Sequence, residues 1–288
     1  MKKLIPLLLC ILLLAGCAQT YDGPTKTEYA LAEIIRETYY DFFGWEESRY
    51  TDRTVYAYDI YGNCVRSMRY REDELVTVSN MKYDDQGNLL SRSSWDHSGW
   101  LPKYEGRTER TYDDQNRLLS SVVYDFWGRQ EYGSWYSYDD EAGIRTHRDE
   151  TGEILQTTWY DENGKDQRQV SGEYETVYEY DDRGNEIGWV SYENDALTYR
   201  WEARYDDQNR IIWSCRHNAS TGESSETTYE YDDEAHTVTV HSGNGDTHIE
   251  YYHPDGRLHM TEYVSADGGS RTIERYIYQQ IQVPAKEE

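Results

Sequence analysis

Large apolar and polar residues alternate along most of the chain, in short runs separated by turn-forming residues. Around position 180, Tyr178 and Tyr180 share one face of an extended segment, and Ile187 and Trp189 share a face beyond the next turn. Alternation with a period of two in aromatic and β-branched residues is typical of a half-buried β-strand. The sequence Asp-Asp-Arg-Gly-Asn at 181–185 has the Asp and Gly residues of a tight turn. The pattern therefore predicts a β-hairpin.

The same unit recurs through the chain. Copies of its Tyr-Asp or related turn begin at Tyr58, Tyr83, Tyr112, Tyr124, Tyr138, Tyr160, Tyr180, Tyr205, Tyr231 and Tyr252. Successive copies start 12 to 29 residues apart, and the short spacings on either side of Tyr124 indicate either half-units or hairpins that share a strand. Where glycine is missing, Asn116, Asn209 and His236 take its place, and Asn and His tolerate positive φ better than most residues. Because a lone hairpin is marginal in water, we expect the hairpins to stack in one elongated array.

The recurring motif Tyr-Asp-x-x-Gly-Asn/Arg-Leu/Ile, present from about Tyr56 to Tyr278, resembles the YD repeat of the RHS family. In that family the repeats form long, twisted β-sheets of hairpins, often closed into a shell around a C-terminal toxin. The resemblance implies a mainly β fold: an elongated, twisted or partly coiled antiparallel sheet of tandem hairpins over residues 45–282, with a tail at 283–288. With about ten repeats and no domain after them, we expect a short open or partly coiled sheet without a toxin domain.

Residues 1–17 have the features of a bacterial lipoprotein signal peptide. A basic start and an apolar run lead to Leu-Ala-Gly-Cys at 14–17, which resembles a lipobox. The resemblance implies cleavage before Cys17 and attachment of lipid to its sulfur, with palmitate as an expected fatty acid. An ordinary signal peptide with a chance cysteine is the alternative. We expect a lipid-anchored, extracytoplasmic protein of the bacterial cell envelope, joined to the membrane by a tether at residues 18–24.

Residues 25–44 predict one amphipathic helix that covers the first edge of the sheet. Thr25 to Glu28 fit a capping box and Gly44 can end the helix. Helical spacing is followed by Leu31, Ile34, Ile35, Tyr39 and Phe42. A helix at this place would protect an exposed strand edge. An interfacial membrane helix is the alternative, but the polar positions are mostly acidic, whereas membrane-surface helices favour Lys and Arg.

Composition and charge narrow the possible partners. The chain has 30 Tyr but three Phe, which suits a thin sheet whose rings pack while their hydroxyls reach water. A net charge of −26 argues against nucleic acid and against anionic lipid head groups, because binding to either needs basic surface. Cys64 and Cys215 lie far apart in the repeat order, so we expect free or packed thiols unless the sheet closes into a ring.

Two groups of residues are candidates for binding metal ions. If Asn244-Gly245 forms a two-residue hairpin turn, His241 faces His248 across the strands and Glu250 follows on the same face. Two His and one carboxylate could bind zinc or a similar metal, although this face is exposed. The Asp pairs at the turns could hold Ca²⁺ weakly, but they lack the spacing of an EF-hand loop. No other cofactor is expected.

The remaining candidates are aromatic side chains. The sequence has no nucleophile elbow and no phosphate-binding Gly loop, so we do not expect an enzyme. Rows of aromatic rings beside polar residues could stack on sugars. The tryptophans that recur through the array are Trp95, Trp100, Trp127, Trp135, Trp159, Trp189, Trp201 and Trp213. Of these, the ones expected to stack on a ligand are Trp135, Trp159, Trp189, Trp201 and Trp213. The sequence therefore predicts a non-catalytic binding module for glycan, cell wall or a protein partner. A structural spacer without a ligand is the alternative, and a metal-dependent hydrolase using His241, His248 and Glu250 is the third hypothesis.

Overall fold

The computed structural model describes residues 25–42 and 45–284, and every regular element in these ranges is a β-strand. The strands are β1 (Thr25–Phe42), β2 (Trp45–Tyr58), β3 (Cys64–Arg71), β4 (Glu74–Tyr83), β5 (Leu89–Asp96), β6 (Lys103–Tyr112), β7 (Leu118–Tyr124), β8 (Gln130–Asp139), β9 (Ile144–Arg148), β10 (Ile154–Tyr160), β11 (Asp166–Ser171), β12 (Tyr174–Tyr180), β13 (Glu186–Glu193), β14 (Ala196–Tyr205), β15 (Ile211–Asn218), β16 (Ser224–Asp232), β17 (Thr237–Ser242), β18 (Thr247–Tyr252), β19 (Leu258–Val264) and β20 (Ser270–Pro284). No described segment is a helix long and apolar enough to cross a membrane.

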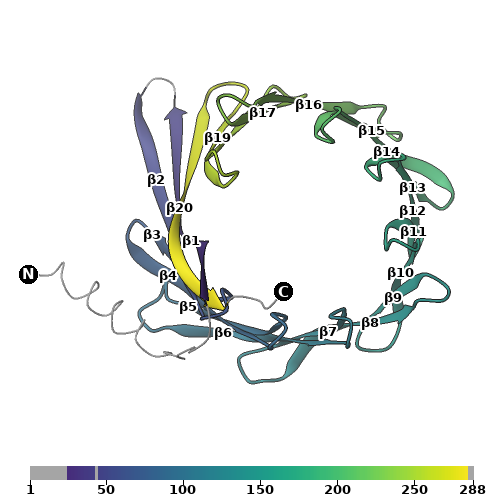
Figure 1. Ribbon diagram of the computed structural model, residues 1–288, viewed down its shortest axis with the longest axis horizontal. Helices are drawn as coiled ribbons and strands as arrows, with labels where there is room; N and C mark the ends of the chain where they lie inside the picture. Colours follow the sequence, from purple (N-terminus) through teal and green to yellow (C-terminus); the bar gives the residue numbers. More distant parts are fainter. Residues whose placement is uncertain (1–24, 43–44, 285–288) are drawn as a thin grey trace, which may run out of the picture.

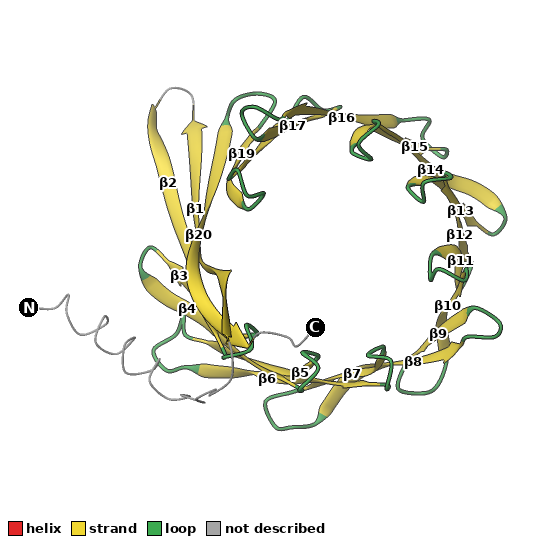
Figure 2. Ribbon diagram, viewed as in Figure 1, coloured by secondary structure: helices red, strands yellow, loops and turns green. Residues whose placement is uncertain are grey.

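The twenty strands form one closed antiparallel ring (Figure 1). Each strand pairs with the next along the chain, as β1 does with β2 and β2 with β3. The last strand, β20, then pairs with β1 from Thr25↔Pro284 to Tyr40↔Ser270. Figure 2 shows the result as strands joined by loops throughout the described residues. Because the first and last strands pair, no described strand is left as an open edge.

The predicted elongated, open or partly coiled sheet of RHS-like repeats is therefore wrong. The Tyr-Asp segments do lie at turns, but these turns connect a single closed meander rather than a stack with two free ends. The sheet also extends beyond the predicted range 45–282, since it begins at Thr25 and ends at Pro284. The predicted sharing of a strand is confirmed, because β7 runs directly from the turn at 113–117 to the turn at 125–129.

The predicted helix at 25–44 is also wrong, because residues 25–42 form the strand that closes the ring. Its register shifts between Leu31 and Glu33, so Leu31 faces Tyr278 and Ile34 faces Tyr276 on the same side of the sheet. Ile35 lies on the other side. The bulge interrupts the period of two and places apolar residues at i, i+3 and i+4, which is the spacing of a helix. A strand that has apolar residues on both faces and contains a bulge can therefore have the residue spacing of an amphipathic helix.

Ion pairs hold the closing seam between β1 and β20. Glu37 is buried, with 5% of its surface exposed, and it pairs with Arg275 of β20. Arg36 pairs with Glu274 on the opposite side of the same two strands. A carboxylate this deeply buried needs a charged partner to offset its lost hydration. The two ion pairs therefore join β1 to β20 in addition to the backbone hydrogen bonds between these strands.

The sheet has little core. Among the described residues, the buried apolar side chains are Ala30, Met68, Val122, Ala203, Ile273 and Val283. We call the face that carries Tyr112, Tyr205 and the equivalent strand-end tyrosines the tyrosine face. Strand alternation places Arg110 on this face and Glu109 on the opposite one. Charged residues at mid-strand on both faces fit a thin ring whose two surfaces contact water.

The two ends of the ring differ. The aspartate rim is formed by the turns 59–63, 84–88, 113–117, 140–143, 161–165, 181–185, 206–210, 233–236 and 253–257. The aromatic rim is formed by the connections at the other end, among them 97–102 and 125–129. In the view of Figure 1 the aspartate-rim turns project inside the ring, and the hairpins of the aromatic rim project outside it.

Candidate functional site

The aspartate rim repeats one turn with small variations. In the turn 113–117, Asp113 Oδ1 accepts hydrogen bonds from the backbone N–H groups of Gln115 (3.0 Å) and Arg117 (2.8 Å). The same pattern is made by Asp59, Asp84, Asp161, Asp181 and Asp206. The prediction that Asn116, Asn209 and His236 replace glycine is confirmed, because their φ angles are 62°, 63° and 54°.

Side chains connect each of these turns to the next. Arg117 forms an ion pair with Asp113 of its own turn (2.7 Å) and with Asp140 of the next turn (2.6 Å). Its guanidinium carbon also lies 4.2 Å from the ring centre of Tyr138, whose hydroxyl donates to the carbonyl oxygen of Leu118 (3.0 Å). The arrangement recurs at Arg210, which pairs with Asp206 and Asp233 and covers Tyr231. These contacts join neighbouring hairpins at their ends.

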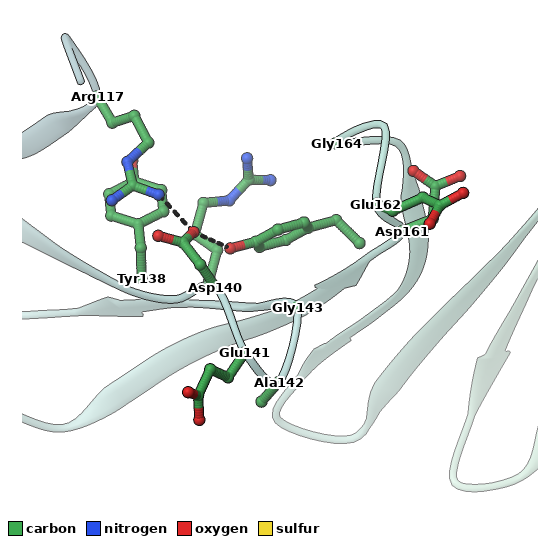
Figure 3. A pocket seen from close by; sticks show the side chains of 11 residues that line it. Arg117, Tyr138, Asp140, Glu141, Ala142, Gly143, Asp161, Glu162 and Gly164 are labelled. Atoms are coloured by element: carbon green, nitrogen blue, oxygen red, sulfur yellow. Dashed lines mark hydrogen bonds and ion pairs between the residues drawn. The ribbon is translucent and has the colours of Figure 1, made fainter.

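A pocket of about 700 Å³ opens between two turns of this rim, as Figure 3 shows. Asp140 is shared inside it, because it accepts hydrogen bonds from Arg117 (2.6 Å) and from the Tyr160 hydroxyl (2.9 Å). These two donors hold the pKa of Asp140 below its usual range. Burial, and then the bond to Asp140, raises the pKa of Tyr160. The acid is therefore ionised and paired at neutral pH, which fits a structural joint rather than a proton-transfer site.

The aromatic rim carries a different kind of surface. Trp95 and Tyr104 pack with their ring centres 4.9 Å apart, and Tyr104 lies 6.2 Å from Phe126. Phe126 meets Trp127 edge to face at 4.9 Å. These rings come from two neighbouring hairpins, β5–β6 and β7–β8, so residues about thirty positions apart in the sequence form one aromatic cluster.

The outer members of this cluster are strongly exposed. Trp127 is 75% exposed and Phe126 is 53% exposed. Trp100 and Leu101, at the tip of the adjoining loop 97–102, are 97% and 69% exposed. Large apolar side chains placed together in water are typical of an interaction surface. We call these residues, with Trp95 and Tyr104, the aromatic cluster.

The five tryptophans expected to stack on sugars do not form one row. Trp189 and Trp201 face each other on the tyrosine face. Trp135, Trp159 and Trp213 lie on the opposite face. Arginines cover two of them, with guanidinium carbons 4.7 Å from the Trp159 ring centre and 4.3 Å from that of Trp213. All five are half-buried. The most exposed tryptophans are instead in loops, where no strand pattern marks them.

The three predicted metal ligands are not brought together. His241 faces Thr247, and His248 faces Val240, so the two histidines lie on opposite faces of the hairpin. The predicted register was wrong because five residues, 242–246, separate the paired positions His241 and Thr247, whereas a two-residue turn leaves an even number between paired positions. This slip of one residue turns a side chain to the other face. His248 Nε2 lies 3.5 Å from Glu250 Oε1. Within the described ranges, no group of three or more His, Cys, Asp or Glu residues is placed to hold a metal ion.

Other predicted sites have simpler outcomes. Cys17 lies outside the described residues. Cys64 and Cys215 are free thiols, although the sheet closes into a ring. The turn aspartates use their Oδ1 atoms for backbone N–H groups, as at Asp113 and Asp206. Weak Ca²⁺ binding at these acids stays a prediction.

No protein-family model and no curated protein sequence matches the chain. Among solved structures, a porin-like protein from Bacteroides uniformis is distantly similar, with 12% identity and a TM-score of 0.36, over 89% of this chain and 99% of that one. A putative outer membrane lipoprotein-sorting protein domain from Vibrio parahaemolyticus has 9% identity and a TM-score of 0.21, over 89% and 88% of the two chains. The functional argument therefore depends on the residues of this chain.

Proposed function

We propose that the protein is a non-catalytic glycan-binding protein of the bacterial cell envelope, anchored by lipid on Cys17. The aromatic cluster is the observation that carries this proposal. Its rings lie on two adjacent hairpins, and Trp100 and Trp127 are 97% and 75% exposed. Flat, rigid rings of this kind pack against the apolar faces of sugar rings at little entropic cost.

Polar groups around the cluster suit the hydroxyls of a glycan. Lys103 follows the loop that carries Trp100, and it is exposed. Arg129 closes the turn that carries Trp127, and its side chain is 74% exposed. A binding surface that combines apolar rings with a few donors is typical of small-molecule and sugar recognition.

The place where the chain enters the ring favours a glycan over a lipid surface. β1 starts at Thr25, which pairs with Pro284 beyond the aspartate rim. The tether at 18–24 spans at most about 25 Å when fully extended. An anchor on Cys17 therefore holds the aspartate-rim end of the ring at the membrane, and the aromatic cluster lies at the other end. The net charge of −26 also opposes contact of this surface with anionic head groups.

The arrangement of the acidic and histidine side chains supports a non-catalytic role. In the rim pocket, Asp140 is paired with Arg117 and bonded to Tyr160. His241 and His248, which a hydrolase would need on one side, lie on opposite faces. The predicted alternative of a spacer without a ligand gives no reason for exposed rings gathered on two adjacent loops.

The test is glycan binding by purified residues 18–288, screened on a panel of envelope polysaccharides and then measured by intrinsic tryptophan fluorescence. We expect the double variant Trp100→Ala/Trp127→Ala to weaken binding at least about tenfold, since two stacking rings are removed. The control is Tyr61→Ala, which removes a 60% exposed ring from the aspartate rim and should leave affinity unchanged. Equal affinity of the double variant, or no response to any glycan, would contradict the proposal.

The anchor is tested separately in bacterial cells. We expect metabolic labelling with a fatty acid to mark the protein and Cys17→Ser to abolish the label, because the thiol is the acyl acceptor. An unchanged label on the Cys17→Ser variant would exclude Cys17 as the acylated residue, whatever the outcome of the glycan experiment.

A further inference from the structure

A second surface lies away from both rims. A groove of about 450 Å³ crosses β2 to β5 on the tyrosine face. Its lining includes the hydroxyls of Ser67, Thr77 and Ser79. Ser79 is only 2% exposed and lies deep in the sheet surface. Because the Ser and Thr side chains are small, they leave an open space, and the larger side chains of Tyr56 and Arg92 border it. The volume is in the range of small-molecule sites.

The charge of this groove is opposite to that of the chain. The protein has 55 acidic and 29 basic residues, yet the groove lining includes Arg69 and Arg92 and no Asp or Glu. The pocket of the aspartate rim, by contrast, has four carboxylates in its lining, beside Arg117 and Arg145. A site of positive charge on a strongly acidic protein attracts anions locally, while the remaining surface repels them.

The guanidinium of Arg92 has unused hydrogen-bonding capacity. It donates to Ser79 Oγ at 3.3 Å, and among the described residues no carboxylate lies within ion-pair distance of it. Arg69 is ion-paired with Asp52 at 3.3 Å, which offsets its charge, so Arg92 is the unpaired cation among the described residues that line the groove. A guanidinium has five N–H donors in a planar fork that matches the two oxygens of a carboxylate. Arg92 can therefore bind an oxyanion with two parallel hydrogen bonds.

We propose that this groove binds the oxyanion of an acidic saccharide, such as the carboxylate of a uronic acid. Arg92 holds the acidic group, and the hydroxyls of Ser67 and Thr77 hydrogen-bond to the sugar. A bare inorganic anion would leave most of the 450 Å³ groove and its hydroxyl row unused. This site shares no residue with the aromatic cluster, so it goes beyond the proposed function and stands or falls independently of it.

The experiment titrates purified residues 18–288 with three probes: a tri-uronate, the same trisaccharide with its carboxyl groups reduced, and inorganic phosphate. We expect the tri-uronate to bind, the reduced sugar not to bind, and phosphate to bind at least tenfold more weakly. Added salt should weaken the tri-uronate complex, because it screens the attraction between the Arg92 guanidinium and the carboxylate. Arg92→Gln should weaken it at least tenfold, and Arg92→Lys should weaken it less, since Lys keeps the charge but loses the planar fork.

The controls separate this groove from other surfaces. Arg200→Gln changes an arginine that is 56% exposed and paired with Glu202 on the opposite face of β14, and it should leave tri-uronate affinity unchanged. Trp100→Ala/Trp127→Ala should also leave it unchanged. The proposal is overturned if the tri-uronate does not bind, if the reduced sugar binds equally well, or if Arg92→Gln has no effect. Phosphate binding as tight as that of the tri-uronate would overturn the assignment to a saccharide.

Discussion

The two rims contain the same turn and use it differently. In both the turn 113–117 and the turn 125–129, an aspartate accepts two backbone N–H bonds and an arginine four residues later pairs with it. At the aspartate rim, Arg117 continues to Asp140 and covers a tyrosine ring, and its side chain is 28% exposed. At the aromatic rim, Arg129 stays with Asp125 and is 74% exposed.

The difference shows what a neighbouring hairpin adds to a local motif. The turn sequence is sufficient to shape the backbone at both places. The turn connects two hairpins only where the next turn has a carboxylate and an aromatic ring within reach of its arginine. The turn 125–129 has no such neighbour in the described part of the chain, and its middle residues Phe126 and Trp127 are exposed and available to a ligand.

Alkaline pH should have the largest effect, because it acts on the tyrosines of the aspartate rim together. Burial raises the pKa of Tyr58 to about 12, and burial with a bond to Glu250 raises that of Tyr252 to about 12. An unfolded tyrosine ionises near its ordinary value of about 10. The stabilisation is therefore complete below pH 10 and is lost as pH rises from 10 to 12.

Urea unfolding followed by circular dichroism at pH 9, 10, 11 and 12 measures this loss, and phenolate absorbance reports the titration. The midpoint should fall over the upper part of the range. Tyr58→Phe should be less sensitive to pH, because it removes one titrating group and its hydrogen bond to the Leu31 carbonyl. A constant urea midpoint from pH 10 to 12 would contradict the prediction.

Gly106→Ala should lower the free energy of unfolding more than any single substitution of an exposed residue of the aromatic rim. Gly106 has a φ of 129°, and a Cβ there would overlap the carbonyl oxygen of Tyr124. We expect a loss of about 2–3 kcal/mol in the free energy of unfolding, from backbone strain and the displaced strand. Gly128→Ala is the matched control, because its φ is 77° but no atom lies near the added methyl. Its cost should be about 1 kcal/mol, and equal losses for both variants would show that the close approach is unimportant.

Arg117→Gln and Arg129→Gln measure how much the equivalent arginine contributes to stability at each rim. Both remove the ion pair with the turn aspartate, but the change at Arg117 also removes the pair with Asp140 and the stacking on Tyr138. Differential scanning calorimetry should show a lower Tm for Arg117→Gln and a nearly unchanged Tm for Arg129→Gln, since an isolated surface pair contributes little. If the two variants melt alike, the contacts between turns do not stabilise the rim.

Trp100→Ala should have the smallest effect on stability. The ring is 97% exposed, so its removal should change the free energy of unfolding by no more than about 0.5 kcal/mol. Chemical unfolding of this variant beside the parent protein measures the change. A loss above about 1 kcal/mol would mean that the ring packs in the fold and is not free to meet a ligand.

The sequence predicts the strands and turns of this protein, but it does not predict that the sheet closes into a ring. Period-two alternation and Asp-Gly turns identify most strands, because both signals lie within a few residues. The pairing of β1 with β20 joins residues more than 200 positions apart, and no local pattern encodes it. The bulge beside Leu31 adds a false helical spacing to the same strand. The sequence therefore predicts a capping helix at residues 25–44, where the structure has the strand β1 that closes the ring.

Site prediction failed for related reasons. The connection 242–246 includes Asn244-Gly245 but has an odd number of residues, so His241 pairs with Thr247 and the two histidines lie on opposite faces. Trp100 and Trp127 are among the candidate aromatics, but no sequence pattern favours them over the others, because both lie in loops, where period-two reasoning does not apply. Their position in Gly-containing connections, with no strand partner to bury them, is the signal that marks them.

Ring closure is the central claim, and disulfide trapping across the seam tests it most directly. Thr38 and Thr272 face each other in β1 and β20, with their hydroxyl oxygens 3.4 Å apart. In residues 18–288 with Cys64→Ser and Cys215→Ser, the pair Thr38→Cys/Thr272→Cys should form an intramolecular disulfide on mild oxidation, because facing strand positions lie within disulfide reach. Thr111→Cys/Ser120→Cys is the control, since its oxygens lie 2.7 Å apart within one hairpin and the pair would close in an open sheet as well. A monomer cross-linked at both pairs confirms the ring, whereas closure of the hairpin pair without the seam pair would contradict it.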